Sequence, residues 1–211
     1  PGLIWAVCVR SPHAHAGIKS IDTAATEAME GVFAVITGND MPESPSKLVD
    51  LGEGNVNFQW ASNKLMAQGK VLYRGQPVAA VAAADRYTAE EAARKVVVKY
   101  DVLPSITNVT DALADNAPVL LGDLVGDDLG EDVTNTNMAE HTRHEFGDVE
   151  GAMASAAHTL EREYNMQMVH QGYIEPHNAT AMWDEEDRIK IWTSTQGAFS
   201  ARTQIAGILQ V

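Results

Sequence analysis

Cysteine, basic residues and long apolar runs are all scarce in this sequence of 211 residues. The single cysteine, Cys8, excludes an intramolecular disulfide and a cysteine-ligated iron-sulfur cluster within the chain. Lys and Arg number 15 against 29 Asp and Glu, and a formal charge of -14 argues against nucleic acid as a partner. No apolar run approaches the ~20 residues that span a bilayer, and the first residues lack a signal-peptide pattern. We therefore expect no membrane span and a cytoplasmic location.

Apolar residues, which make up 45% of the chain, recur in short runs broken by Gly, Pro, Asn and Asp. This pattern is typical of a globular fold, and the order of elements predicts the α/β or α+β class. A first group places strands at 3–10, 17–22 and 32–37 around a short helix at 24–29, capped by Asp22 or Thr23. Cys8 is expected to be buried in the first of these strands. A second group places a central strand at 77–84, a helix from a Thr88 and Glu91 capping box through Lys95, and a strand at 96–102.

The remaining segments are less regular. Residues 42–70 are rich in Pro, Ser, Gly and Asn and predict a long loop. An excess of Asp and Glu between Asp123 and Glu150 indicates a solvated segment, and we predict an acidic linker over 105–146 with one short helix at 110–114. Asp148 is expected to cap a helix through Ala157. Alternating apolar residues then predict a strand at 159–168, followed by strands at 178–183 and 188–194 and a helix at 199–209.

His13 and His15 are the first candidates for metal ligands. In an extended segment their alternate spacing directs both side chains to one face, so chelation is geometrically possible. No third ligand stands at a recognisable spacing, so we predict hydrogen-bonded structural histidines and no metal site. A histidine-dependent metal hydrolase would rest on these two residues alone. The sequence from Arg74 to Pro77 is interpreted as a turn that starts a strand.

Gln196 lies where a predicted strand ends and a predicted helix begins. From such a position a side-chain amide can donate a hydrogen bond to an oxyanion or a metal-bound oxygen. Capping or bracing of the loop is the alternative role for this residue.

Five segments, taken together in their order and spacing, resemble one family. Three of them are Val9-Arg-Ser-Pro-His-Ala-His-Ala-Gly-Ile18, Gly31-Val-Phe-Ala-Val-Ile-Thr-Gly38 and Tyr73-Arg-Gly-Gln-Pro-Val-Ala-Ala-Val81. The other two are Gln171-Gly-Tyr-Ile-Glu-Pro-His177 and Trp192-Thr-Ser-Thr-Gln196. The chain thereby resembles the large subunit of the molybdenum hydroxylases, the xanthine dehydrogenase and aldehyde oxidase family. The resemblance implies an α/β hammerhead domain over 1–104 and, over 147–211, the incomplete start of the first molybdopterin-binding domain.

The resemblance also implies residue roles. Gln196 would hydrogen-bond an oxo group of the molybdenum centre, with Gly197 and Phe199 beside the cofactor. Glu175 and His177 would lie near the core of the cofactor domain, where they would brace the fold or, as the alternative, touch the substrate. The family's Gly-Phe-Gly-Gly loop and its catalytic glutamate do not occur before Val211, so the remainder of the molybdenum subunit is expected to complete the site. We therefore expect the isolated chain to be inactive.

The implied activity is the oxidation of an aldehyde, a purine-like heterocycle or an aryl-CoA substrate, with water as the oxygen source. A molybdenum-molybdopterin cofactor would be used, and electrons would pass to Fe-S and FAD groups on an iron-sulfur subunit and an FAD subunit. The alternative is a non-catalytic hammerhead module that serves assembly with the iron-sulfur partner.

Overall fold

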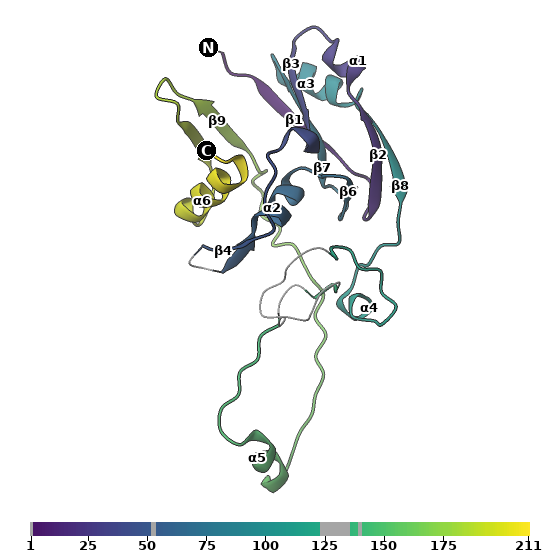
Figure 1. Cartoon of the computed structure of the whole chain (residues 1–211), viewed down its shortest axis with the longest axis vertical. Helices are drawn as coiled ribbons and strands as arrows, with labels where there is room; N and C mark the ends of the chain where they lie inside the picture. The colour runs from purple at the N-terminus through teal and green to yellow at the C-terminus, as the bar shows by residue number, and fades with distance from the viewer. Residues whose placement is uncertain (1, 52–53, 123–135, 139–140) are drawn as a thin grey trace. The chain divides into compact units, whose positions relative to one another are not determined.

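The computed structural model describes residues 2–51, 54–122, 136–138 and 141–211. The chain divides into unit 1, made of Pro1–His141 and Phe199–Val211, and unit 2, made of Thr142–Ala198. Figure 1 labels most of the helices and strands of both units. Most of the acidic part of the predicted linker, residues 123–135 and 139–140, lies outside the described residues. The predicted domain boundaries stay a prediction.

Unit 1 is built around two antiparallel sheets of three strands each. The first has the order β1-β7-β3, formed by Trp5–Arg10, Pro77–Ala83 and Val32–Thr37. The second has the order β6-β2-β8, formed by Lys70–Val71, Ala16–Asp22 and Val97–Val102. Strand β7 is central, as its run of small apolar residues predicted, and its residues Val78, Ala79 and Val81 are fully buried.

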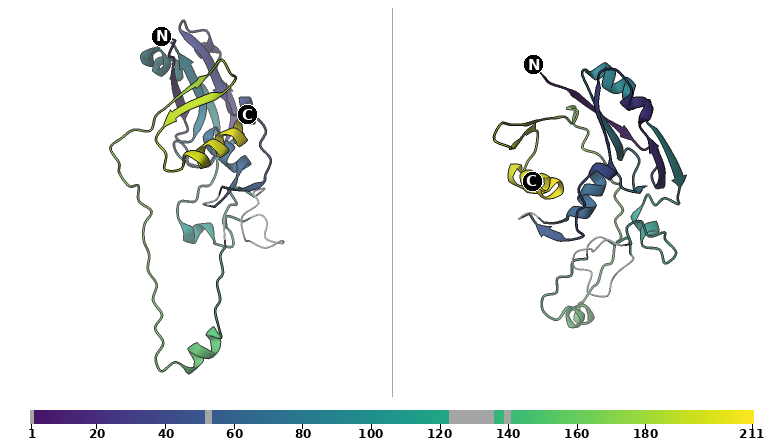
Figure 2. Two further views of the ribbon diagram at one scale, coloured as in Figure 1. Left: turned by 90° about the vertical axis from the view of Figure 1, so that its left-hand side faces the viewer. Right: turned by 45° about the horizontal axis from the view of Figure 1, so that its top comes forward.

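Two helices cover one end of unit 1. The helix α3 (Arg86–Ala93) packs against β1 and β7, and the short helix α1 (Ala24–Glu27) lies beside it (Figure 2). The buried hydroxyl of Thr26 in α1 donates to the carbonyl oxygen of Ala92 in α3 at 3.1 Å. Ala92 also joins Ala79 and Val81 in the apolar core, so the helix layer and the sheet bury each other.

The predicted capping box of α3 is wrong. The N-cap is Asp85, whose carboxylate accepts from the backbone N–H groups of Tyr87 and Thr88 at 2.8 and 3.0 Å. Thr88 therefore lies inside the first turn, and Glu91 does not reach back to cap the helix. An aspartate at this position satisfies two free N–H groups and places its charge near the positive end of the helix.

The prediction that β1 and Cys8 are buried is also wrong. β1 is an edge strand with a helix on one face only, so its residues alternate in exposure. Val7 and Val9 are half-buried, whereas Trp5 and Cys8 are exposed. A short apolar run could not reveal that only one face of the strand would be covered.

The predicted loop over 42–70 contains regular structure instead. The short 3-10 helix η1 (Gly38–Asp40) comes just before it, and three elements then follow, β4 (Leu48–Asp50), β5 (Asn55–Asn57) and α2 (Phe58–Leu65). Strands β4 and β5 form an antiparallel hairpin. Asn57 caps α2 by accepting from the N–H of Trp60 at 3.2 Å. Two of the polar residues that suggested a loop, Asn57 and Ser62, are here a helix cap and a buried hydrogen-bond partner of Gln68.

The predicted turn before β7 is confirmed. Gly75 has φ +91°, which favours glycine, and Pro77 begins the strand. Gln76 is fully buried and joins α2 to the segment after β6: its amide nitrogen donates to Asn63 O at 2.6 Å, and its oxygen accepts from Leu72 N at 2.7 Å. This residue has a bracing role that the sequence did not indicate.

The last helix of the chain, α6 (Ala198–Leu209), was predicted almost residue for residue. Its Gly207 lies against α2, because a Cβ at this position would come within 2.2 Å of Phe58 Cε2. The side-chain amide of Gln210, just after the helix, donates to Glu43 O at 2.5 Å. The short helix α4 (Val109–Ala112) corresponds to the one predicted at 110–114.

Unit 2 contains one helix and one hairpin. Asp148 caps α5 (Val149–Ser155), as predicted, by accepting from Gly151 N at 2.8 Å. Strands β9 (Ala179–Trp183) and β10 (Ile189–Thr193) pair antiparallel. The predicted strand at 159–168 is wrong: this segment has no regular structure, and Met166 and Met168 are 93% and 99% exposed. Alternation predicts a strand only where a partner strand and a covering layer exist.

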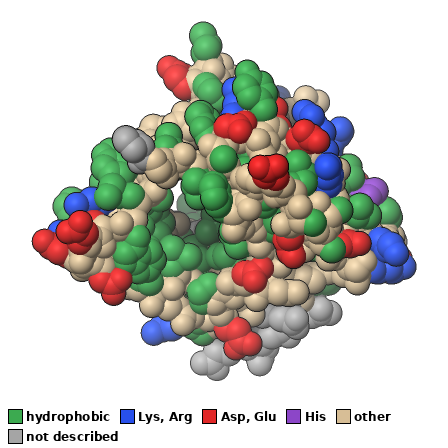
Figure 3. Space-filling view, turned by 90° about the horizontal axis from the view of Figure 1, so that it is seen from above, with side chains coloured by type: hydrophobic (Ala, Val, Ile, Leu, Met, Phe, Trp, Pro, Cys, Tyr) green, Lys and Arg blue, Asp and Glu red, His purple; other side chains and the backbone are tan. Residues whose placement is uncertain are grey.

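Hydrophobic side chains reach the surface beside acidic ones over the face shown in Figure 3. Among the described helices, none combines the length and the apolar character that crossing a bilayer requires.

Candidate functional site

Gln196 lies in the short segment between the end of β10 and the start of α6, where the sequence placed it. The residue is exposed, and no hydrogen bond of its side chain is found with the described residues. The loop is braced by its neighbour instead, since Thr195 Oγ1 accepts from the N–H of Gly197 at 3.2 Å. The amide of Gln196 is therefore available to donate to a bound group.

Gly197 and Phe199 follow directly. Gly197 is half-buried, and Phe199 in the first turn of α6 is 80% exposed. The Arg202 guanidinium lies 5.9 Å from the centre of the Phe199 ring, within the range of a cation-π contact. Contact of these residues with a cofactor stays a prediction.

His177 belongs to a stack of aromatic rings that precedes β9. Its Nε2 is hydrogen-bonded to the hydroxyl of Tyr173, and the two rings stack with centres 5.1 Å apart. The ring of His170 lies 4.8 Å from that of Tyr173, and its Nδ1 accepts from Gly172 N at 3.0 Å. Sequence reasoning missed Tyr173, although its spacing from the two histidines was visible. Glu175 is exposed, and its bracing role stays a prediction.

The two histidines of the Pro-His-Ala-His segment have different surroundings. His15 is buried, and its Nδ1 donates to the carbonyl oxygen of Pro104 at 2.6 Å. The ring of His13 meets that of Tyr100 edge to face, with centres 4.9 Å apart. Burial raises the pKa of the Tyr100 hydroxyl, and a hydrogen bond with Ser11 lowers it by less. In the described ranges, no three His, Cys, Asp or Glu side chains are grouped to hold a metal ion.

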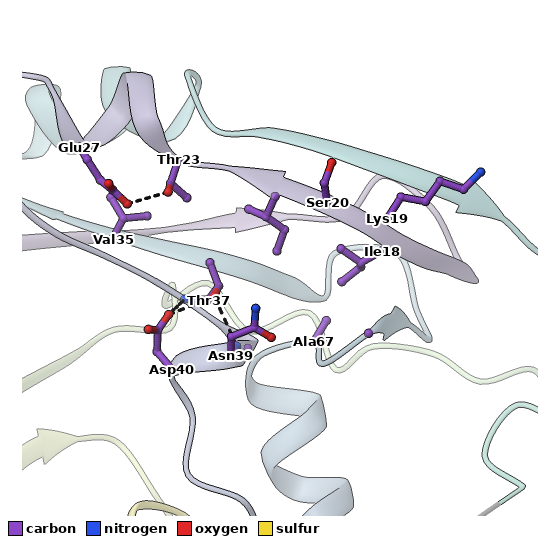
Figure 4. Close-up of a pocket in the computed structure, with 13 residues that line it drawn as sticks. Ile18, Lys19, Ser20, Thr23, Glu27, Val35, Thr37, Asn39, Asp40 and Ala67 are labelled. Atoms are coloured by element: carbon purple, nitrogen blue, oxygen red, sulfur yellow. Dashed lines mark hydrogen bonds between the residues drawn. The ribbon is translucent and has the colours of Figure 1, made fainter.

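A pocket of about 430 Å³ opens in unit 1 between β2 and β3 (Figure 4). Its lining comes from both strands, from α1 and η1, and from the segment around Ala67 and Gly69. Because these segments are far apart in the sequence, no local motif could have revealed it.

Charged side chains line this pocket. Asp40 Oδ2 accepts from the N–H and the hydroxyl of Thr37 at 2.7 and 3.0 Å. Glu27 Oε1 accepts from the hydroxyl of Thr23 at 2.6 Å. The third charged group is Lys19, whose ammonium lies 3.0 Å from a carboxylate oxygen of Asp101.

Two family models match the chain. Residues 1–104 match the a/b hammerhead domain of aldehyde oxidase and xanthine dehydrogenase. Residues 130–211 match the molybdopterin cofactor-binding domain.

Individual proteins give the same result. The chain is 32% identical to the carbon monoxide dehydrogenase large chain of Afipia carboxidovorans over 210 residues, which is 98% of this chain and 25% of the relative. It is 33% identical to the 6-hydroxypseudooxynicotine dehydrogenase complex subunit gamma of Paenarthrobacter nicotinovorans, over 91% of this chain and 23% of that protein. The crystal structure of quinoline 2-oxidoreductase from Pseudomonas putida 86 is similar with a TM-score of 0.78 and 28% identity, over 100% of this chain and 25% of that one. The chain thus spans about a quarter of the length of these relatives.

Proposed function

Because the chain belongs to the xanthine dehydrogenase and aldehyde oxidase family of molybdenum hydroxylases, we propose that it forms part of the molybdenum-binding subunit of such an enzyme. The whole enzyme would be an oxidoreductase that uses water as its oxygen source. Residues 1–104 would supply the hammerhead domain, and residues 147–211 would begin the cofactor domain.

The observation that carries this proposal is the placement of Gln196. Its amide is exposed at a strand end, has no partner in the described part of the chain, and is followed by a glycine that leaves room for close approach. A side-chain amide is a neutral donor that can orient an oxygen-rich group without changing its charge. Gln196 would donate to the cofactor, with Gly197 and Phe199 beside it. When bound, the molybdenum-molybdopterin group supplies the two-electron oxidation of the substrate.

The substrate and the partners belong to the same proposal. An aldehyde, a purine-like heterocycle or an aryl-CoA compound is the proposed substrate class, whereas the names of the relatives include carbon monoxide, a nicotine derivative and quinoline. Electrons would leave through Fe-S and FAD groups on an iron-sulfur subunit and an FAD subunit. One cysteine cannot ligate a cluster, so the Fe-S groups would lie outside the chain. A cytoplasmic location is also proposed.

The test is the variant Gln196→Ala in the complete subunit with its partners. Turnover per bound molybdenum should fall by roughly tenfold to a thousandfold, the range for loss of one preorganised donor. The matched control is Gln167→Ala, since Gln167 is also an exposed glutamine of unit 2 and lies in the irregular segment. An unchanged rate for Gln196→Ala would contradict the proposal and favour the non-catalytic assembly module.

A further inference from the structure

Strand β3 is a sheet edge with little of the usual protection along its middle, although at its end the N–H of Thr37 is already bonded to Asp40 Oδ2. Among the described residues it pairs with β7 on one side and with no strand on the other. Its sequence, VFAVIT, contains neither a charged residue nor a proline, and its one irregularity lies at its start, between Val32 and Ala34. Exposed edges normally carry lysine, proline or a bulge, because free N–H and C=O groups pair readily with another chain. Phe33 and Ile36 of this edge strand are 63% and 42% exposed.

The pocket between β2 and β3 borders this edge. Val35 and Thr37 line it from β3, and Ile18 and Ser20 line it from β2 (Figure 4). On the side of β2 away from β8, β6 pairs only with Ala16 and Gly17, and the N–H of Ile18 still donates to Gly69 O at 2.8 Å. A register shift at Lys19 interrupts β2 just beyond that point. The pocket is therefore a slot between two sheets, and β3 is its less protected wall.

The charge of the slot is negative. Its three charged side chains are Lys19, Glu27 and Asp40, and Lys19 is paired with Asp101 outside the slot. Glu27 and Asp40 each use one carboxylate oxygen in bonds to threonines. The second oxygen of each carboxylate takes part in no hydrogen bond within the described part of the chain. These oxygens are available to a cation from outside.

We propose that an extended segment of a partner protein, bearing Lys or Arg at alternate positions, adds to β3 as a further strand and places its cations at Glu27 and Asp40. Backbone pairing with β3 would supply affinity, and the two carboxylates would select a basic sequence. A second copy of this chain fits less well. Its own β3 brings no cation, and two chains of formal charge -14 repel each other.

The probe is a synthetic peptide, acetyl-Lys-Val-Lys-Val-Lys-Val-amide, titrated into the chain of 211 residues at low salt. We expect saturable binding, with the amide signal of Val35 among the most shifted in NMR spectra. N-methylation of alternate peptide nitrogens removes the donors to β3 and should weaken binding at least about tenfold. A peptide with Glu in place of Lys should bind at least about tenfold more weakly.

Glu27→Gln keeps the size of an exposed side chain and removes its charge, so it should weaken binding of the basic peptide about threefold to tenfold. The matched control is Glu91→Gln, on α3 and paired with Lys95, which should leave binding unchanged. Equal binding of the N-methylated peptide would overturn strand addition. Equal effects of the two glutamate variants would overturn the role of the slot. Concentration-dependent dimerisation that blocks the peptide would show that a second copy is the occupant.

Discussion

The two units of this chain use similar local patterns with different results. Unit 1 has a helix layer on a sheet, and its strand β7 is fully buried at Val78, Ala79 and Val81. Unit 2 has a capped helix and a regular hairpin, yet none of its residues is buried. Caps and strand pairing satisfy backbone groups, but burial needs a second layer from elsewhere in the chain or from another chain. A segment can thus form regular helices and strands without forming a buried core.

The largest difference should appear in amide hydrogen exchange. Amides of β7 pair on both sides and lie under α3, so they should exchange only when unit 1 unfolds. Amides of the β9-β10 hairpin should exchange at least about a thousandfold faster, because opening a two-stranded ribbon exposes no core. Exchange measured by NMR or mass spectrometry on the intact chain tests this. Equal protection of β7 and β9 would contradict the comparison.

Truncation of an apolar side chain should destabilise the protein more in unit 1 than in unit 2, and this difference should be smaller than the one in hydrogen exchange. Val81→Ala removes two methyl groups from a fully buried site and should lower the free energy of unfolding by about 2 kcal/mol. Met166→Ala removes a side chain that is 93% exposed and should change the free energy of unfolding by less than about 0.5 kcal/mol. Urea unfolding followed by circular dichroism gives both values. A loss at Met166 as large as that at Val81 would mean that Met166 is covered in solution.

The structural features that could be predicted from the sequence are those that depend on residues close together in the chain. The central strand β7, the turn at Gly75, the cap at Asp148 and the helix α6 are all set by local apolar runs or capping chemistry. The position of Gln196 between a strand and a helix was predictable for the same reason.

The errors share another cause. The burial of Cys8 depends on which element covers its face of β1, and strand formation at 159–168 depends on a partner strand. A single sequence reveals neither. The slot beside β3 is formed by segments far apart in the chain, and so is the contact of Gly207 with Phe58. The family resemblance reached beyond local patterns because it compares order and spacing along the chain.

Within unit 1, the contact between α6 and α2 should respond to a single methyl group. Gly207→Ala places a Cβ 2.2 Å from Phe58 Cε2, and such overpacking typically costs about 1–3 kcal/mol. Alanine in place of glycine favours a helix by about 1 kcal/mol, so the net loss should be about 1 kcal/mol. Urea unfolding of Gly207→Ala in the wild-type and Phe58→Leu backgrounds measures the coupling. If the penalty is the same in both backgrounds, the ring is not its cause.

The smallest expected effect compares two aspartates, one in each unit, at low pH. Hydrogen bonds from Thr88 and Tyr87 hold the pKa of Asp85 below its usual value of 3.8. The pKa of Asp184 is also lowered, first by the backbone N–H of Arg188 and then by Lys190. A carboxylate whose pKa is lowered in the folded state adds stability above its unfolded pKa, near 3.8. That stability is lost as the pH falls through the folded pKa.

Asp85 caps a helix of the core, so its protonation should lower the global stability of unit 1, whereas protonation of Asp184 should loosen only the β9-β10 turn. Asp85→Asn should therefore flatten the acid side of the stability curve of unit 1 below about pH 4, and Asp184→Asn should leave that curve unchanged. Urea unfolding at pH 7 and pH 3, with hairpin signals followed separately by NMR, distinguishes the two. Parallel pH curves for Asp85→Asn and the wild type would show that this cap does not depend on its charge.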